Sequence, residues 1–199
     1  MPLLLPYTYL GPIRYYSSIV QHKNIVLEGH ENFPKQTYRN RCTIYGANGP
    51  LNLIVPVEHK SGERSIGIKR ISYQENWQKL HWKSLETAYR SSPFFEYYED
   101  EFSDILMKQH ELLIDLNTQL MTLVLKILDI EMDSSNTSSY KDEFNGLDLR
   151  EDFAPNADLA DKGDFKRYTQ VFEDRHGFIP NLSIVDLIFN QGPGSKDYL

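Results

Sequence analysis

The chain of 199 residues is 40% hydrophobic and carries a net charge of −7, which supplies one sizeable core and disfavours general nucleic-acid binding. A single cysteine excludes an intramolecular disulfide, and no apolar run approaches the roughly 20 residues of a membrane span, so we expect a cytoplasmic protein. Residues 1–90 hold twelve Lys and Arg against six Glu, whereas residues 91–199 hold nine basic against twenty-two acidic residues. The basic half suggests a surface for an anionic ligand.

The first elements are predicted to be a strand, a helix and a strand. Leu3–Leu5 is expected to be a buried strand rather than a signal peptide, since two prolines flank it and no basic leader precedes it. Pro12 suits the first position of a helix over Ile13–Gln21, and Ile25–Leu27 is a second apolar run. A helix start next to a buried strand favours an anion, but without a glycine-rich loop ordinary turn packing is the better interpretation.

The next segment is predicted to form a β-hairpin. Residues 39–45 alternate in polarity, residues 46–50 supply a turn somewhat longer than the tightest kind, and residues 51–55 return as an apolar strand. Residues 66–71 could add a third strand to this sheet.

Alternation along the first hairpin strand separates its side chains onto two faces. Arg39 and Arg41 share one face, and Asn40, Cys42 and Ile44 share the other. The cation of Arg41 therefore points away from the Cys42 thiol, and burial of Cys42 is favoured over an activated thiol.

Helices are predicted for the middle of the chain. Apolar residues recur at helical spacing over Trp77–Arg90, and again over Asp104–Ile130, which we expect to be one long amphipathic helix. An aromatic cluster lies between them and is expected to belong to the core rather than to a cofactor site: Phe94, Phe95, Tyr97, Tyr98 and Phe102.

The last third begins with residues 131–164, which are polar and rich in Ser and acidic residues and are predicted to be an irregular surface excursion. A final helix is expected over Pro180–Phe189, closed by Gly192 and Pro193. Asp186 inside this apolar helix is expected to meet a basic partner from the first half or a backbone group.

Together these elements predict a single domain of the α/β or α+β class. A small mixed sheet comes from the N-terminal half, and the C-terminal half is mainly helical. The expected parts are a sheet-rich basic part over residues 1–75, a helical part over 76–130, the irregular excursion over 131–164, and a C-terminal helix packing back within 165–199.

Several passages in order resemble the WbqC-like family of bacterial proteins: Tyr9-Leu10-Gly11-Pro12 with Tyr15-Tyr16, then Tyr38-Arg39-Asn40-Arg41 through Gly49-Pro50 to Val55-Pro56-Val57, then His81-Trp82-Lys83 through Tyr89 to Pro93-Phe94-Phe95. The run over residues 177–187 resembles the end of shorter members, whereas residues 131–164 are shorter and less regular than in longer ones. The resemblance implies a setting in O-antigen and surface-polysaccharide biosynthesis, with glycine transfer suggested for some members. It supplies no catalytic residues.

Chemistry at the matching positions nominates four residues first. Arg39 and Arg41 offer planar forks for the phosphates of an activated donor, and the alternative is a pair of solvated cations. Asn40 would orient the donor, unless it bonds to backbone. His81 is the candidate catalytic base, because its imidazole titrates near neutrality; the alternative is a satisfied core histidine.

Three further residues complete the predicted substrate site. Tyr9 belongs to the first matching passage, and Tyr89 could orient a substrate, although packing is the simpler role. Lys83 lies two residues beyond His81 and points to a different side of the helix. No spacing of His, Cys or carboxylates matches a defined metal site, and no cofactor is identified.

The predicted function is a transferase in surface-polysaccharide biosynthesis, with an anionic donor, either an activated acyl compound or a nucleotide sugar, and a glycan precursor as acceptor. The alternative is a non-catalytic module that binds a nucleotide, RNA or an acidic protein, or a scaffold for other enzymes. Aromatic residues interleave with arginines in the basic half and could stack bases, although overall acidity disfavours nucleic acid: Tyr7, Tyr9, Tyr15, Tyr16 and Tyr38 with Arg14, Arg39 and Arg41.

Overall fold

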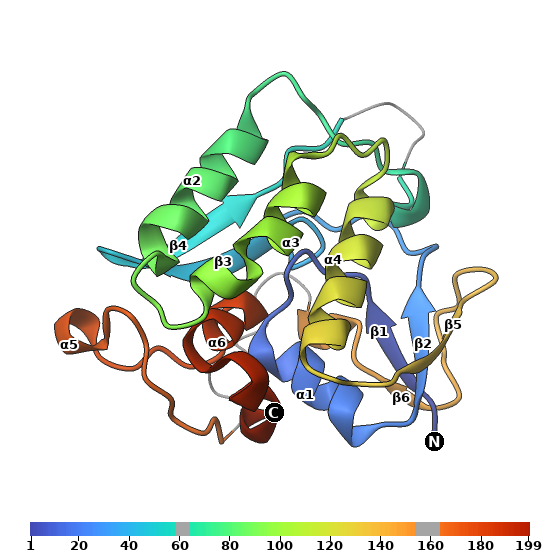
Figure 1. Cartoon of the computed structure of the whole chain (residues 1–199). Coiled ribbons are helices and arrows are strands. Elements are labelled where there is room, and N and C mark those ends of the chain that lie inside the picture. The colour runs from blue at the N-terminus through green and yellow to red at the C-terminus, as the bar shows by residue number, and fades with distance from the viewer. Residues whose placement is uncertain (59–63, 154–163) are drawn as a thin grey trace.

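A computed structural model, which describes residues 1–58, 64–153 and 164–199, shows the predicted mixed α/β fold (Figure 1). Within these residues the strands form two separate sheets rather than one mixed sheet. Four short parallel strands lie in the order β5-β2-β1-β6, in the right-hand half of Figure 1, and an antiparallel hairpin of β3 and β4 lies in the left-hand half beside α2. The parallel strands are β1 (Leu3–Pro6), β2 (Asn24–Glu28), β5 (Asp133–Asn136) and β6 (Leu147–Asp148).

The predicted strand, helix and strand at the start of the chain are confirmed. Helix α1 (Ile13–Gln21) follows Pro12 and connects β1 to its parallel neighbour β2, with Leu3 opposite Ile25. Ile13 N donates to Leu182 O, so the first helical N–H group is satisfied within the protein. The chain therefore uses this helix start for packing, as the simpler interpretation predicted.

The predicted irregular segment contributes two strands to the sheet. Strand β5 pairs with β2, and β6 pairs with β1, so residues far apart in the chain complete the parallel sheet on both sides of β1 and β2. All four residues of β5 are exposed, and its sequence Asp133-Ser134-Ser135-Asn136 has no apolar alternation. Backbone pairing with β2 places this strand without an apolar side-chain pattern, which explains why periodicity did not reveal it. Residues 154–163 of the predicted excursion lie outside the described residues.

The hairpin is confirmed with different limits. Strand β3 (Arg41–Gly46) begins two residues later than predicted, and β4 (Gly49–Ile54) follows after a two-residue turn, shorter than expected. Gly49 takes a φ of +103°, which glycine adopts without strain. The predicted third strand is wrong: Ile66–Ile68 form a short 3-10 helix.

Helix α2 (Trp77–Tyr89) is confirmed, whereas the single long helix expected over residues 104–130 is wrong. It divides into α3 (Phe95–Met107) and α4 (Leu113–Ile127). The connection between them is extended at Lys108, and its backbone bonds to residues 69–71, with Ile71 N donating to Glu111 O. Tertiary pairing of this short connection outweighs the continuous helical pattern of its side chains.

The last helices close the core. A short helix α5 (Glu173–His176) precedes α6 (Ile184–Gln191), whose side chains are almost all buried. Phe189 of α6 contacts the rings of Phe95 and Phe102 at centroid distances of 5.0 and 5.3 Å, so these two aromatic residues belong to the core as predicted. Tyr97 of the same cluster is exposed.

Candidate functional site

Tyr9 and His81 of the predicted site lie together. Tyr9 Oη is 2.8 Å from His81 Nδ1, and both side chains are buried. Burial lowers the pKa of His81 to about 4, opposed in part by a hydrogen bond with the Ile54 backbone. Burial also holds the pKa of Tyr9 well above its usual value. The phenol is therefore the donor, and a neutral imidazole accepts.

This environment does not favour the predicted role of His81 as catalytic base. An imidazole with a pKa near 4 takes up a proton poorly at neutral pH, and its ring already has polar partners in two other parts of the fold. His81 instead joins α2 to the segment after β1 and to β4.

Arg39 lies inside the protein, not on the strand face where it was predicted beside Arg41. Its side chain is fully buried and makes a bidentate ion pair with Glu31, with both N···O distances 2.9 Å. The remaining donors reach the carbonyl oxygens of Phe153 and Arg150. Because β3 begins only at Arg41, alternation does not apply to Arg39, and its guanidinium is not available to a donor phosphate.

The neighbouring candidates also have different surroundings. Asn40 is buried, and its side-chain amide donates to Val55 O at 2.8 Å. It therefore bonds to backbone, which was the alternative to its orienting a donor. Arg41 is partly exposed. Lys83 is exposed on α2, and its Nζ lies 3.2 Å from Glu86 Oε2. Within the described residues, no side-chain hydrogen bond links Asn40, Arg41 or Lys83 to the ion pair of Arg39 with Glu31.

Tyr89 is a buried structural residue in this fold. Its hydroxyl donates to Asp186 Oδ1 at 2.8 Å and accepts from Tyr45 N at 3.0 Å. Asp186 also accepts from Tyr168 and Gln170, so its described partners are neutral donors rather than the predicted basic group. Burial raises the pKa of Asp186 to about 6, although these hydrogen bonds oppose the increase.

A different set of side chains meets at the carboxyl edge of the parallel sheet. Tyr7 follows β1, Glu28 ends β2, Asn136 ends β5, and Asp148 ends β6. Tyr7 Oη donates to Asn136 Oδ1 at 2.7 Å, which links two of these strand ends. Open parallel sheets bind their ligands outside this edge, because the strand-to-helix connections leave a crevice there.

Arg150, two residues beyond β6, organises the charged part of this edge. Its guanidinium makes hydrogen bonds of 2.7 and 3.1 Å to both carboxylate oxygens of Asp148 and lies 3.3 Å from Glu28 Oε2. Burial alone would raise the pKa of Asp148, but the hydrogen bonds from Arg150 outweigh it and lower that pKa. Glu28 and Arg150 are both buried.

The two buried ion pairs are adjacent. Arg39, paired with Glu31, donates to the backbone oxygen of Arg150, which is paired with Glu28. Burial raises the pKa of Glu31, opposed by the hydrogen bond from Arg39. Removing charged groups from water costs roughly several kcal/mol per ion, so we take this buried cluster at the sheet edge as the candidate functional site.

A pocket of about 230 Å³ lies beside this cluster, between the sheet face that carries Leu4 and Val26 and the segment after β5. We call it the carboxyl-edge pocket. Its lining combines a carboxylate, an amide, hydroxyls, an amine and an aromatic ring: Leu4, Val26, Glu28, Asn136, Thr137, Ser138, Ser139, Lys141 and Phe144.

Glu28 is part of the lining of this pocket. Its Oε1 accepts from His30 N at 2.7 Å and from Thr137 Oγ1 at 2.9 Å, and among the described residues the contact of Oε2 is with Arg150 at 3.3 Å. A carboxylate can accept about four hydrogen bonds, so these partners leave part of its acceptor capacity unused.

Sequence reasoning did not nominate this cluster. The one signal was an acidic residue, Glu28, directly after the apolar run of β2. Asn136, Asp148 and Arg150 lie in a segment without apolar periodicity, so nothing in the pattern placed them beside β1 and β2.

In the part of the chain that the structure describes, no helix is both long and apolar enough to cross a membrane. Among the same residues no three His, Cys, Asp or Glu side chains are grouped so that they could hold a metal ion.

Comparisons with known proteins cover most of the chain. A family model described as the WbqC-like protein family matches residues 4–151, a range that contains the whole carboxyl-edge cluster from Tyr7 to Arg150. The chain is also 25% identical, over 219 residues, to the uncharacterized protein Rv1507c of Mycobacterium tuberculosis; the match covers 93% of this chain and 91% of that protein. No solved structure matches this chain.

Proposed function

The chain belongs to the WbqC-like protein family, and from this premise we propose that it is a cytoplasmic transferase in the biosynthesis of a bacterial surface polysaccharide such as O-antigen. The transferred group is glycine or a related acyl group, carried from an activated donor to a sugar precursor. The resemblance to the family supports the biological setting. The geometry of the carboxyl-edge pocket supports the place where substrate binds.

The observation that carries the proposal is the buried carboxylate of Glu28 in the lining of a pocket that also holds hydroxyl groups and an amide. Sugars present several hydroxyls and an apolar ring face, so they suit a pocket that pairs such groups with Phe144. Lys141 lies in the lining as a point charge for a phosphate of a nucleotide-linked sugar.

In this proposal Glu28 accepts a hydrogen bond from the attacking hydroxyl or amine of the acceptor and takes its proton as the new ester or amide bond forms. The bond between the acyl carbonyl and the leaving group of the donor breaks, and Glu28 returns the proton to that leaving group as it departs. Arg150 positions the carboxylate from the other side. His81 does not line the carboxyl-edge pocket, and in this proposal its hydrogen bond with Tyr9 stabilises the fold.

The alternative of a nucleic-acid-binding module receives less support. Base stacking needs exposed aromatic faces, but Tyr7, Tyr9, Tyr15 and Tyr16 are all buried. Of the three arginines expected to neutralise phosphate, Arg39 is buried in its ion pair with Glu31 and Arg14 is paired with Asp152, whereas Arg41 is partly exposed.

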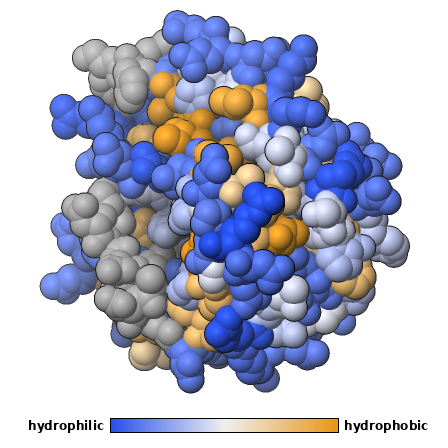
Figure 2. All heavy atoms as spheres, turned by 90° about the vertical axis from the view of Figure 1, so that its left-hand side faces the viewer, coloured by the Kyte–Doolittle hydropathy of each residue, from blue (hydrophilic) through white to orange (hydrophobic). Residues whose placement is uncertain are grey.

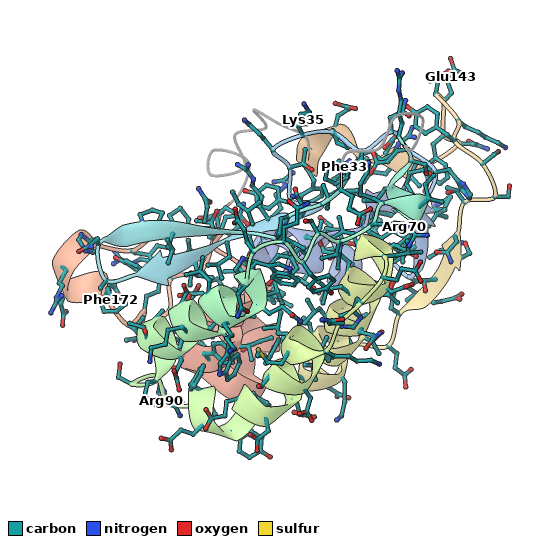
Figure 3. The ribbon with its side chains drawn as sticks, turned by 90° about the horizontal axis from the view of Figure 1, so that it is seen from above. Phe33, Lys35, Arg70, Arg90, Glu143 and Phe172 are labelled. Atoms are coloured by element: carbon teal, nitrogen blue, oxygen red, sulfur yellow. The ribbon has the colours of Figure 1, made fainter. Side chains whose placement is uncertain are left out.

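The proposal is tested by calorimetric titration with UDP-N-acetylglucosamine as the probe, on the wild type and on Glu28→Gln. The amide keeps the size of the side chain and removes its charge, so we expect affinity to fall at least tenfold. Glu143→Gln is the matched control, because Glu143 is exposed and its side chain points outward at the edge of the molecule (Figure 3). This control should bind like the wild type.

Equal affinity in Glu28→Gln and the wild type would remove Glu28 from the site. Single-stranded RNA is titrated in parallel over a range of salt concentrations. Steeply salt-dependent RNA binding without nucleotide-sugar binding would favour the module over the transferase.

A further inference from the structure

The segment after β5 forms one wall of the carboxyl-edge pocket. We call residues 138–143 the strap; it lies in the connection from β5 to β6, at the right-hand edge of Figure 1. Ser138, Ser139 and Lys141 of the strap line the pocket. All residues of the strap are exposed. One side of the strap therefore faces the pocket, and the rest of it faces solvent.

Both ends of the strap are fixed to the parallel sheet. Before the strap, Thr137 Oγ1 donates to Glu28 Oε1 at 2.9 Å. After it, Leu147 N donates to Pro2 O at 3.0 Å, and Gly146 approaches the same carbonyl so closely that an added Cβ would overlap it. Movement of the strap is therefore confined to the residues between these two ends.

The middle of the strap is held by Arg150. Within the described residues, one hydrogen bond joins the strap to the rest of the chain: Arg150 Nη2 donates to Asp142 O over 3.4 Å, which is long for such a bond. The guanidinium also lies against the ring of Tyr140, with Cζ 5.0 Å from the ring centroid, and we call this contact the latch. Tyr140 is still 49% exposed, so solvent reaches the latch. The closed position of the strap thus depends on two contacts that are weaker than those at its ends.

The guanidinium of Arg150 is held from the sheet side independently of the strap. It makes hydrogen bonds to both carboxylate oxygens of Asp148, the shortest at 2.7 Å, and lies 3.3 Å from Glu28 Oε2. The strap can therefore leave Arg150 without breaking these ion pairs. An opened strap would admit water to the buried pair of Glu28 and Arg150, and charges are better solvated in water, which lowers the cost of opening.

The chemistry of the strap indicates movement in water rather than a docking site for an apolar partner. Apart from Tyr140, its side chains are polar: Ser138, Ser139, Lys141, Asp142 and Glu143. By contrast, Figure 2 shows hydrophobic residues at the surface on the left-hand side of the molecule as drawn in Figure 1, away from the strap. A segment with few buried apolar contacts opens locally at low free energy, and lids over binding sites have this property.

We propose that the strap is a lid over the carboxyl-edge pocket, which opens to admit a nucleotide-linked sugar and closes on it, with the latch of Tyr140 on Arg150 holding the closed form. The bound ligand adds a second connection, because Glu28 on the sheet and Lys141 on the strap both contact it. Binding then favours the closed form, in which both contacts are made. This inference rests on the proposed function, since it takes the carboxyl-edge pocket as the substrate site.

Lys141 makes the strap its own reporter, because trypsin cleaves after lysine. Cleavage of the bond between Lys141 and Asp142 is followed by mass spectrometry, at trypsin concentrations where the rate follows the population of the open strap. Each rate is divided by that of a synthetic peptide of residues 136–146 with the same substitution, which removes the direct effect of the substitution on trypsin. In the ligand-free protein we expect Tyr140→Ala to raise this normalised rate at least about fivefold.

Two variants control this comparison. Tyr140→Phe keeps the ring against Arg150, so its normalised rate should equal that of the wild type. Glu143→Gln changes an exposed strap residue whose side chain points outward (Figure 3), and it should also match the wild type. Equal rates in Tyr140→Ala and the wild type overturn the proposal. A rise in Tyr140→Phe or in Glu143→Gln as large as in Tyr140→Ala also overturns it, because the ring contact would then not be what holds the strap.

UDP-N-acetylglucosamine separates this inference from the proposed function. At a saturating concentration it should lower the cleavage rate of the wild type at least about fivefold, because binding favours the closed form. Calorimetric binding that leaves the cleavage rate unchanged overturns the lid and leaves the transferase proposal standing. Absence of calorimetric binding overturns the proposed function, and the comparison of Tyr140→Ala with the wild type in the ligand-free protein then decides whether the strap is latched.

Discussion

The hydroxyl of Tyr9 donates to Nδ1 of His81 at 2.8 Å, across 72 positions of sequence and in a fully buried setting. The bond joins the segment after β1 to the middle of α2, and so couples the parallel sheet to the half of the molecule that carries the hairpin. The residue predicted as catalytic base, His81, and one predicted to bind substrate, Tyr9, thus share a buried hydrogen bond that connects two parts of the fold.

Tyr9→Phe tests the stabilising value of this bond. The variant leaves the imidazole nitrogen buried without its donor, so the free energy of unfolding should fall by about 1–3 kcal/mol in urea titration. Tyr97→Phe, which removes an exposed hydroxyl, should change stability by less than about 0.5 kcal/mol. Equal stability of Tyr9→Phe and the wild type would show that the buried bond contributes nothing net.

The pH dependence of stability should contain two opposing contributions. The pKa of His81 is about 4 in the folded state, below its usual 6.5, so the stability that the neutral imidazole contributes is lost as pH falls from about 6.5 to 4. The pKa of Asp186 is about 6, above its usual 3.8, so its contribution is lost as pH rises from about 3.8 to 6. Each of these pKa shifts changes the free energy of unfolding by about 3 kcal/mol across its pH range.

Variants separate the two contributions. In urea titrations from pH 4 to 6.5, His81→Gln should gain stability on acidification relative to the wild type, because only the Asp186 contribution remains. Asp186→Asn should lose more stability on acidification than the wild type. Parallel pH profiles for all three proteins would contradict both assignments.

The buried ion pair of Arg39 and Glu31 predicts a strongly non-additive response. Arg39→Met leaves Glu31 as a buried charge without its partner and should cost about 3–5 kcal/mol. The double variant Arg39→Met/Glu31→Met removes both charges, and we expect it to recover at least half of that loss in a double-mutant cycle. Additive single and double effects would rule out energetic coupling between the two side chains.

Gly192 is expected to be intolerant of a side chain. It ends α6 with a φ of +53°, and an added Cβ would overlap the ring of Phe94. Gly192→Ala should therefore lower the midpoint of thermal unfolding by several degrees, the order expected for a loss of about 1–2 kcal/mol. Gly194→Ala is the matched control, since a Cβ there meets open space, and its midpoint should stay close to that of the wild type.

Local patterns predicted the elements whose own side chains carry the signal. Pro12 before an amphipathic run placed α1, spacing of apolar residues placed α2, and Gly192 with Pro193 marked the end of α6. These features act within a few residues, so the chain needs no knowledge of distant partners to show them.

Elements that depend on distant backbone could not be found in this way. The connection at Lys108–Leu112 is extended because it pairs with residues 69–71, although its side chains continue a helical pattern. Strand β5 is polar throughout, and its backbone pairing with β2, not an apolar pattern, makes it a strand. Arg39 was predicted on a strand face, but it is buried in an ion pair with Glu31, eight residues earlier in the chain.

The sequence by itself determined the mixed α/β class, the βαβ start, the hairpin and the family, because these follow from local periodicity, turn residues and ordered motifs. Only the tertiary structure decided which polar residues meet. Glu28 and Arg150 are separated by 122 positions and come together because β6 adds to the sheet beside β1. Backbone hydrogen bonds between strands leave no pattern in side-chain chemistry, and so the site they assemble is visible only in the fold.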